Sequence, residues 1–212
     1  MRLRPARLLV LLACAPLPAA RVTQAPLQPK QTIVFLGDSL TAGLGLAAEQ
    51  AYPALIQRRL DSEGRPARVV NAGVSGDTTA GGAARLDWIY RQRIDVLVVA
   101  LGANDGLRGI PLASTERNLR SILDRAKREK SRVLLVGMQL PENYGPVYRR
   151  QFQAIYPRLA KAYRVALLPF LLEGVALRPE LNQADGIHPN AKGAAKVSET
   201  VWKALAPVLE GK

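Results

Sequence analysis

The amino-acid sequence predicts one three-layer α/β/α domain of the flavodoxin-like type, with a parallel sheet of five strands in the order 2-1-3-4-5. Three observations lead to this fold class. Short aliphatic runs alternate with longer segments of helical periodicity, a pattern typical of parallel strands joined by helices. The short runs are mostly apolar, as strands covered on both faces must be. The chain has 212 residues, 48% of them hydrophobic, which supplies one core and leaves no surplus for a second.

The predicted strands and helices follow one another in order along the chain. The strands are expected at residues 32–36, 68–71, 95–101, 132–137 and 165–168. The helices are expected at residues 52–63, 79–92, 115–130, 146–163 and 190–209. The third helix shows its period most clearly, because Leu119, Ile122, Leu123 and Ala126 fall on one stripe. We find no internal repeat and no low-complexity segment.

The first twenty residues have the composition of a secretory signal peptide. A basic start with Arg2, Arg4 and Arg7 leads into a short apolar run and a tail of small residues. The run is too short to span a bilayer, which takes about 20 residues. Cys14 follows Leu-Leu-Ala in a pattern that resembles the lipobox of bacterial lipoproteins, so lipidation and ordinary cleavage both stay open. We expect an exported protein, periplasmic or lipid-anchored in a bacterial envelope, with a linker at 21–31 and the folded domain at 32–212.

The chain is basic, with 30 Lys and Arg residues against 17 Asp and Glu and a formal charge of +13. Much of the excess falls on two predicted helical stretches, 117–132 and 149–164, between the apolar positions. A solvated helix face explains this pattern. Aromatic side chains for stacking on bases do not interleave with the charges, so we expect no nucleic-acid partner. Attraction to an anionic membrane surface or an acidic lipid stays open. A monomer is favoured.

Four loops hold the residues that can carry chemistry. Three of them follow the first, second and third strands, at 37–43, 71–79 and 101–109, and are rich in Gly, Asn, Asp and Ser. These strands are adjacent in the predicted order, so their carboxyl ends converge where open α/β sheets bind ligands. The fourth loop, 185–189, lies between the last strand and the last helix and should open onto the same edge.

A nucleophile and a base can be assigned within these loops. His188 is the one histidine of the chain, and Asp185 precedes it by three residues across a glycine. A tight turn can therefore bring the carboxylate to one ring nitrogen and leave the other free to take a proton from a hydroxyl. Ser39 lies in a glycine-bounded turn directly after a strand, and we expect it to be the nucleophile, although it could instead cap a helix. Ser75 is the rival, but its surroundings lack the closing glycine of a G-x-S-x-G elbow.

Donors for a developing oxyanion are expected in the same loops. The Asn104 side-chain amide, at the end of the third strand, could donate to the oxyanion, although asparagine is also common in turns. The backbone N–H groups of Ser39 and Gly73 would join it, because glycine at position 73 lets the main chain approach a substrate closely. An acyl chain would need an apolar groove. The loops around Leu107, Ile110, Pro111 and 140–144, including Tyr144, are expected to line that groove.

These blocks resemble the GDSL, or SGNH, hydrolase family. The four ordered blocks are Gly-Asp-Ser-Leu at 37–40, Gly73, Asn104 within 102–105, and Asp185-x-x-His188. The resemblance covers residues 33–209 and implies that Ser39, Gly73, Asn104 and His188 are the residues of the family's name. Segments 75–79, 104–109, 139–145 and 185–189 are similar to the bacterial multifunctional esterases of that family. This implies small-molecule substrates: acyl thioesters, lysophospholipids and aryl esters.

Two departures and several alternatives accompany this resemblance. Ala103 stands where the subfamily often has glycine and Glu142 where proline is common, so preference for acyl-chain length does not carry over. A carbohydrate O-deacetylase of the same family and a non-catalytic basic lipid-binding module are the alternative functions. The G-x-G-x-x-A pattern at 43–48 fits a dinucleotide site poorly, because it starts seven residues beyond the strand. With one histidine, and its one cysteine in the leader, the chain is expected to use no metal and no cofactor.

Overall fold

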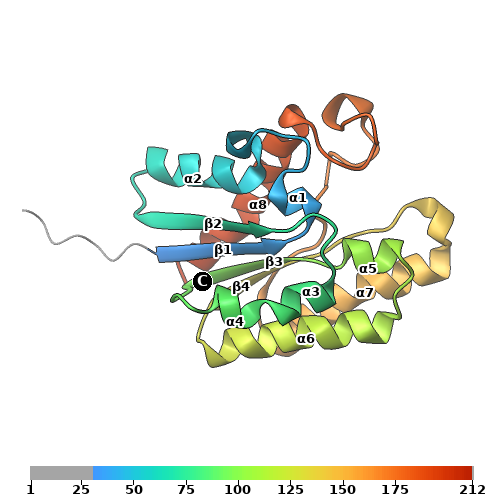
Figure 1. Ribbon diagram of the computed structural model, residues 1–212, viewed down its shortest axis with the longest axis horizontal. Helices are drawn as coiled ribbons and strands as arrows, with labels where there is room; N and C mark the ends of the chain where they lie inside the picture. The colour runs from blue at the N-terminus through green and yellow to red at the C-terminus, as the bar shows by residue number, and fades with distance from the viewer. Residues whose placement is uncertain (1–30, 212) are drawn as a thin grey trace, which may run out of the picture.

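The computed structural model describes residues 31–211, which form a five-stranded parallel sheet in the order β2-β1-β3-β4-β5 (Figure 1). The strands are β1 (Gln31–Gly37), β2 (Ala67–Gly73), β3 (Val96–Ala100), β4 (Arg132–Val136) and β5 (Ala166–Leu168). The predicted fold class and strand order are confirmed. The predicted leader, Cys14 and nearly all of the linker lie outside the described residues, so export and lipidation stay predictions.

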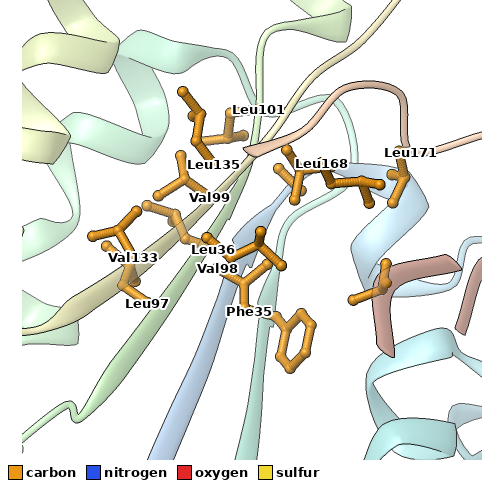
Figure 2. Packing of buried hydrophobic residues seen from close by; sticks show 14 of the residues in the cluster. Phe35, Leu36, Leu97, Val98, Val99, Leu101, Val133, Leu135, Leu168 and Leu171 are labelled. Carbon is orange, nitrogen blue, oxygen red and sulfur yellow. The ribbon is translucent and has the colours of Figure 1, made fainter. Parts of the chain in front are cut away.

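The central strands of the sheet form the core. In β1, the side chains of Ile33, Val34, Phe35 and Leu36 are at most 1% exposed, and every residue of β3 is buried. Figure 2 shows side chains of β1, β3 and β4 packed against one another within this core. Burying an aliphatic or aromatic side chain of this size contributes about 1.5–3 kcal/mol. The core therefore holds the central strands firmly, and with them the loops that follow their carboxyl ends.

Helices cover the two faces of the sheet in separate groups (Figure 1). On one face lie α2 (Tyr52–Ser62) and α8 (Ala191–Leu209), and on the other lie α3 (Thr79–Ala84), α4 (Leu86–Ile89), α6 (Leu112–Arg128) and α7 (Pro146–Tyr163). The apolar stripe predicted for α6 is buried, and α7 has the predicted bounds at both ends. Between residues 31 and 211, no helix is long and apolar enough to cross a membrane.

The predicted helix at 79–92 is instead two short helices, α3 and α4, that meet at Arg85. Gly81 and Gly82 lower the helix propensity of α3. At Arg85 the backbone leaves helical geometry, with φ −98° and ψ 9°. The Arg85 side chain turns toward Asp77 and the end of β1, where it makes hydrogen bonds that a side chain on a solvated helix face would lack. The apolar periodicity of the segment did not reveal this break.

Five short helical segments were not predicted. They are α1 (Ser39–Ala42), η1 (Ala48–Gln50), α5 (Ala103–Leu107), η2 (Glu142–Tyr144) and η3 (Pro179–Leu181). Segments of three to five residues are too short to show a hydrophobic period, so sequence patterns cannot reveal them. Two of them, α1 and α5, begin just beyond the carboxyl ends of β1 and β3 and carry residues that were predicted to be functional.

Candidate active site

The register of the sheet places three of the predicted loops at one level. Gly37, the last residue of β1, lies opposite Gly73 of β2 and Ala100 of β3. The chain therefore leaves the sheet at the same edge in three neighbouring strands. This is the edge at which parallel α/β sheets bind ligands.

Ser39 is the first residue of α1 and is held there by its neighbours. The Asp38 carboxylate caps the helix by accepting a hydrogen bond from the Leu40 N–H at 3.0 Å. Gly37 must be glycine, because a Cβ atom there would lie 2.0 Å from Thr41 Oγ1. The Thr41 hydroxyl in turn shares a 2.8 Å hydrogen bond with the buried Tyr52 hydroxyl, which ties α1 to α2. Asp38 is thus the capping residue, and the Ser39 hydroxyl is left for another partner.

That partner is His188, from the loop before α8. His188 Nε2 lies 2.9 Å from Ser39 Oγ, and His188 Nδ1 lies 2.7 Å from Asp185 Oδ2. The Asp185 carboxylate also accepts hydrogen bonds from the backbone N–H groups of Ile187 and His188, both at 3.0 Å. With the ring proton on Nδ1, Nε2 is an acceptor for the Ser39 hydroxyl proton. The structure thus brings the three residues of the predicted triad into one chain of hydrogen bonds.

The loop that carries His188 is fixed by Gln183. The Gln183 backbone N–H donates to the His188 carbonyl at 2.7 Å, and the Gly186 N–H donates back to the Gln183 carbonyl at 2.9 Å. The Gln183 side-chain amide donates to the carbonyls of Leu44, at 2.7 Å, and Pro189, at 2.9 Å. Since Leu44 follows α1, this side chain joins the histidine loop to the serine loop. Sequence analysis did not identify Gln183, because a lone glutamine in a loop gives no signal.

Two carboxyl groups flank the Ser39–His188 pair, and their pKa values are shifted in opposite directions. The two backbone N–H groups and the imidazole that bind Asp185 lower its pKa from 3.8 to about 2. Burial raises the pKa of Asp38 from 3.8 to about 6, against the hydrogen bond from Leu40, which lowers it. Asp185 is therefore ionised throughout the neutral range, as an orienting partner for an imidazole must be.

Asn104 lies in α5 and lines the cavity beside Ser39. Its amide nitrogen donates one hydrogen bond to the Asp77 carbonyl at 2.9 Å. An amide nitrogen carries two hydrogens, and within residues 31–211 the second has no acceptor. Asn104 can therefore donate to a ligand while its own position is held by Asp77.

Gly73 has a different place from the one expected. Its N–H donates to the Asn71 side chain at 2.9 Å, and it is not among the residues that line the cavity. A Cβ atom at Gly73 would lie 2.3 Å from the Ala42 backbone nitrogen, so glycine is needed here for the close packing of β2 against α1. The close approach predicted for this glycine is to α1 and not to a substrate.

Gly76 occupies the position expected of Gly73. It lines the cavity and is the third residue of a β-turn closed by the Asp77 N–H on the Val74 carbonyl at 3.0 Å. Its φ of +78° is the conformation that glycine favours at this turn position. Between residues 31 and 211 the Gly76 N–H has no hydrogen-bond partner. A four-residue turn with glycine third was visible in the sequence and could have identified Gly76.

One large cavity of about 630 Å³ lies against Ser39, His188 and Asn104. Its wall is mainly apolar, formed by residues from loops that follow several strands of the sheet. The apolar residues that line it include Leu107, Met138, Leu140, Phe170, Leu172, Ala176, Leu177 and Ile187. Glu142 and Arg149 are charged residues that also line it.

Only some of the residues predicted to line an apolar groove lie at this cavity. Leu107 lines the cavity, whereas Ile110, Pro111 and Tyr144 do not. The Tyr144 hydroxyl instead donates to the Leu107 carbonyl at 2.9 Å, so Tyr144 supports the cavity wall from behind. Four other apolar residues of the cavity wall were not predicted: Met138, Phe170, Leu172 and Ala176. These residues follow β4 and β5, where an apolar side chain that faces a cavity has the same sequence signal as one that faces the core.

The remaining predicted alternatives can also be placed. Ser75 lines the cavity, but the imidazole is bonded to Ser39. Gly43 ends α1 in a left-handed conformation with φ 80°, which gives the first glycine of the 43–48 pattern a local structural role. No group of three or more His, Cys, Asp or Glu side chains in the described part of the chain is placed to hold a metal ion.

Comparisons with known proteins identify the family of the chain. The sequence profile of the GDSL-like lipase/acylhydrolase family matches residues 35–196. The esterase TesA of Pseudomonas aeruginosa is 47% identical over 180 residues, covering 84% of this chain and 90% of that protein. The thioesterase 1/protease 1/lysophospholipase L1 of Escherichia coli K12 is 44% identical over 179 residues, covering 84% and 85%. A crystal structure of TesA superposes with a TM-score of 0.82 at 46% identity, covering 84% of this chain and 99% of that one.

Both the profile match and these identities extend over most of the chain, and the solved structure shares its fold. The resemblance seen in the sequence is confirmed. The chain is a hydrolytic enzyme and belongs to the GDSL-like lipase/acylhydrolase family.

Proposed function

We propose that this enzyme hydrolyses carboxylic esters and thioesters by two-step acyl transfer through Ser39. The observation that carries the proposal is the hydrogen-bonded chain Ser39–His188–Asp185, at 2.9 Å and 2.7 Å. Its members come from loops at opposite ends of the domain sequence. Such an arrangement has no function in packing a core, whereas it is what activation of a serine hydroxyl requires.

The reaction follows from the donors and acceptors of these three residues. Ser39 Oγ attacks the carbonyl carbon while its proton moves to His188 Nε2. When the tetrahedral intermediate collapses, the leaving alcohol or thiol takes that proton and an acyl-Ser39 ester remains. Water then attacks this ester, His188 takes the water's proton and returns it to Ser39 Oγ, and the carboxylic acid is released. Asp185 stays ionised, keeps the ring proton on Nδ1 and stabilises the imidazolium.

Three N–H groups are proposed to hold the oxyanion of the tetrahedral intermediate. They belong to the Ser39 backbone, the Gly76 backbone and the Asn104 side chain. Gly76 replaces Gly73 in this role, because the Gly73 N–H is bonded to Asn71, whereas Gly76 lines the cavity and its N–H has no partner within the described residues. Removing one donor of this kind typically costs about 3 kcal/mol of transition-state stabilisation, or 10²- to 10³-fold in rate.

The cavity supports an acyl group larger than acetyl. A space of about 630 Å³ with a largely apolar wall buries an aliphatic chain favourably, whereas an acetyl group would leave most of it unfilled. The E. coli relative is named a thioesterase and a lysophospholipase, which supports thioester and lysophospholipid bonds as substrates of this chain. We therefore favour acyl thioesters, lysophospholipids and aryl esters as substrates over acetylated carbohydrates.

A substrate panel with two serine variants tests this proposal. Wild type, Ser39→Ala and Ser75→Ala are compared on p-nitrophenyl butyrate, a long-chain acyl thioester and an acetylated sugar. We expect wild type and Ser75→Ala to hydrolyse the first two substrates well and the acetylated sugar poorly, and Ser39→Ala to be at background. Because Ser75 lines the same cavity, it is a matched control for loss of a hydroxyl. Turnover that survives Ser39→Ala, or a preference for the acetylated sugar, would contradict the proposal.

A further inference from the structure

The carbonyl of Gly37 joins the nucleophile loop to the turn that carries Gly76. It accepts a hydrogen bond from the Val74 N–H at 3.0 Å and a second from the Arg85 guanidinium at 3.2 Å. Val74 is the first residue of the Gly76 turn, and Gly37 directly precedes Asp38 and Ser39. The Gly37 carbonyl oxygen is thus hydrogen-bonded both to the Gly76 turn and to Arg85.

Arg85 also binds the far end of the Gly76 turn, through the side chain of Asp77. The Arg85 Nε atom donates to Asp77 Oδ2 at 2.9 Å, and its Nη2 atom lies 2.8 Å from the same carboxylate oxygen in an ion pair. The side chains of Arg85 and Asp77 are only 22% and 10% exposed, so the pair is largely shielded from water. By contrast, the side chain of Arg93, which pairs with Asp95, is 89% exposed. A largely buried ion pair of this kind holds its partners more firmly than an exposed one.

Asp77 is connected to both proposed oxyanion donors outside the nucleophile loop. It is the last residue of the Gly76 turn, and its carbonyl accepts the amide hydrogen bond of Asn104 at 2.9 Å. A shift of Asp77 would therefore move the Gly76 N–H and release the Asn104 side chain together. Since Arg85 binds Asp77 and Gly37 at once, it sets the position of these donors relative to Ser39.

We propose that Arg85 is a positioning residue that holds the oxyanion donors Gly76 and Asn104 in register with the Ser39 nucleophile. This inference rests on the proposed function. Arg85 is not among the residues that line the cavity, so it acts through Asp77 and Gly37 and not on the substrate. Its planar guanidinium can serve a carboxylate and a carbonyl in fixed directions, which the single nitrogen of lysine cannot do in the same geometry. The break between α3 and α4 at Arg85 accompanies this role.

A merely stabilising ion pair would behave differently from a positioning residue. Loss of stability lowers the fraction of folded enzyme but leaves the turnover of each folded molecule unchanged. Loss of positioning lowers kcat per active site while KM changes little, because the affected donors act on the transition state. The pH dependence of kcat should not change, since no hydrogen bond or ion pair joins Arg85 to His188 or Asp185.

The experiment compares Arg85→Gln and Arg85→Lys with Arg93→Gln, a matched control at the opposite end of the sheet. Active sites are counted by exhaustive labelling with a fluorophosphonate, and thermal unfolding is followed alongside, with assays well below each Tm. For p-nitrophenyl butyrate we expect Arg85→Gln to lower kcat per active site by about 10- to 100-fold with KM within about threefold. Arg85→Lys should lose about tenfold, and Arg93→Gln less than about twofold. If Arg85→Gln does not fold, Arg85→Lys, which keeps the charge, carries the test.

The outcomes separate this inference from the proposed function. The inference alone would be overturned if Ser39→Ala abolishes turnover but Arg85→Gln keeps kcat per active site within about twofold of wild type. A Tm that falls while kcat per active site stays unchanged would do the same, because it assigns Arg85 a purely structural role. If Ser39→Ala turns over substrate as fast as wild type, both the proposed function and the inference are overturned.

Discussion

Two aspartates flank the Ser39–His188 pair, and they differ in burial, in hydrogen bonding and in the direction of their pKa shifts. Asp38 is 2% exposed, and one backbone N–H, that of Leu40, donates to it. The Asp185 side chain is 45% exposed and binds two backbone N–H groups and the imidazole. Burial raises the pKa of Asp38 to about 6, and hydrogen bonding lowers the pKa of Asp185 to about 2.

The difference indicates that being adjacent to Ser39 in the chain does not make a carboxylate suitable for the proposed catalytic role. Asp38 is adjacent to Ser39 in the chain, yet its environment opposes its charge, and it serves as a helix cap. Asp185 is distant in sequence, but its hydrogen bonds stabilise the charge and orient it toward the ring. The same side chain is thus structural in one loop and, in the proposed mechanism, catalytic in the other because of what binds its oxygens.

The largest expected difference in kcat is between variants that remove the negative charge of Asp185 and of Asp38. Asp185→Asn should lower kcat by about 10³- to 10⁴-fold, because a neutral amide no longer fixes the ring tautomer or stabilises the imidazolium. Asp38→Asn, which keeps a good capping residue, should lower it by less than about tenfold. Steady-state kinetics on p-nitrophenyl butyrate measure both. Equal losses in the two variants would break the comparison.

A smaller loss of kcat is expected when Asn104, a neutral donor proposed to bind the oxyanion, is removed. Asn104→Ala should lower kcat by about 10²- to 10³-fold with KM within about threefold, because the amide acts mainly on the transition state. Asn118→Ala is a matched control, since that amide donates to Thr79 away from the cavity. An unchanged kcat in Asn104→Ala would remove Asn104 from the mechanism.

The raised pKa of Asp38 predicts a gain in stability when its charge is removed. Because the folded-state pKa of about 6 lies above the ordinary 3.8, folding favours the protonated carboxyl, and wild type loses this contribution as the pH rises through 6. Asp38→Asn should therefore raise the free energy of unfolding by up to about 3 kcal/mol near pH 8 and by less than about 1 kcal/mol near pH 4. Urea denaturation at the two pH values measures the difference. A gain that is equal at both would contradict the assigned charge state.

The lowered pKa of Asp185 predicts that removing its charge lowers the free energy of unfolding, the opposite of Asp38, and by a smaller amount. Its ionised form stabilises the fold above the ordinary pKa of 3.8, and this contribution is lost as the pH falls through about 2. Because the side chain is nearly half exposed, solvent screens the interaction, and Asp185→Asn should cost less than about 1 kcal/mol near pH 7. Urea denaturation of the Asp185 and Asp38 variants should therefore give changes of opposite sign at neutral pH.

The sequence predicted the fold better than the details of the site. Helix α7 was placed at its observed bounds and the stripe of α6 was correct, because long amphipathic helices show their period. The prediction of one helix at 79–92 was wrong, because the backbone leaves helical geometry at Arg85. The Arg85 side chain there binds Asp77 and Gly37, and such contacts leave no trace in the apolar periodicity. Segments as short as α1 and α5 have no period to detect.

Within the site, residues with distinctive chemistry were predicted and residues with common chemistry were not. Ser39, Asp185 and His188 are brought together as the spacing of the lone histidine suggested. Gly73 was predicted as an oxyanion donor because glycine lets the main chain approach a substrate closely, whereas the backbone geometry shows that Gly76 lines the cavity. Apolar lining residues such as Phe170 cannot be separated from core residues in a single sequence.

The central claim is that His188 activates Ser39 to form an acyl-enzyme. The most direct measurement is rapid acid quenching of the reaction with a p-nitrophenyl ester, followed by peptide mapping by mass spectrometry. We predict the acyl mass increment on the peptide that contains Ser39 in wild type, and no increment at the same time point in His188→Ala. An increment on the Ser75 peptide, or full acylation of Ser39 without the imidazole, would contradict the account.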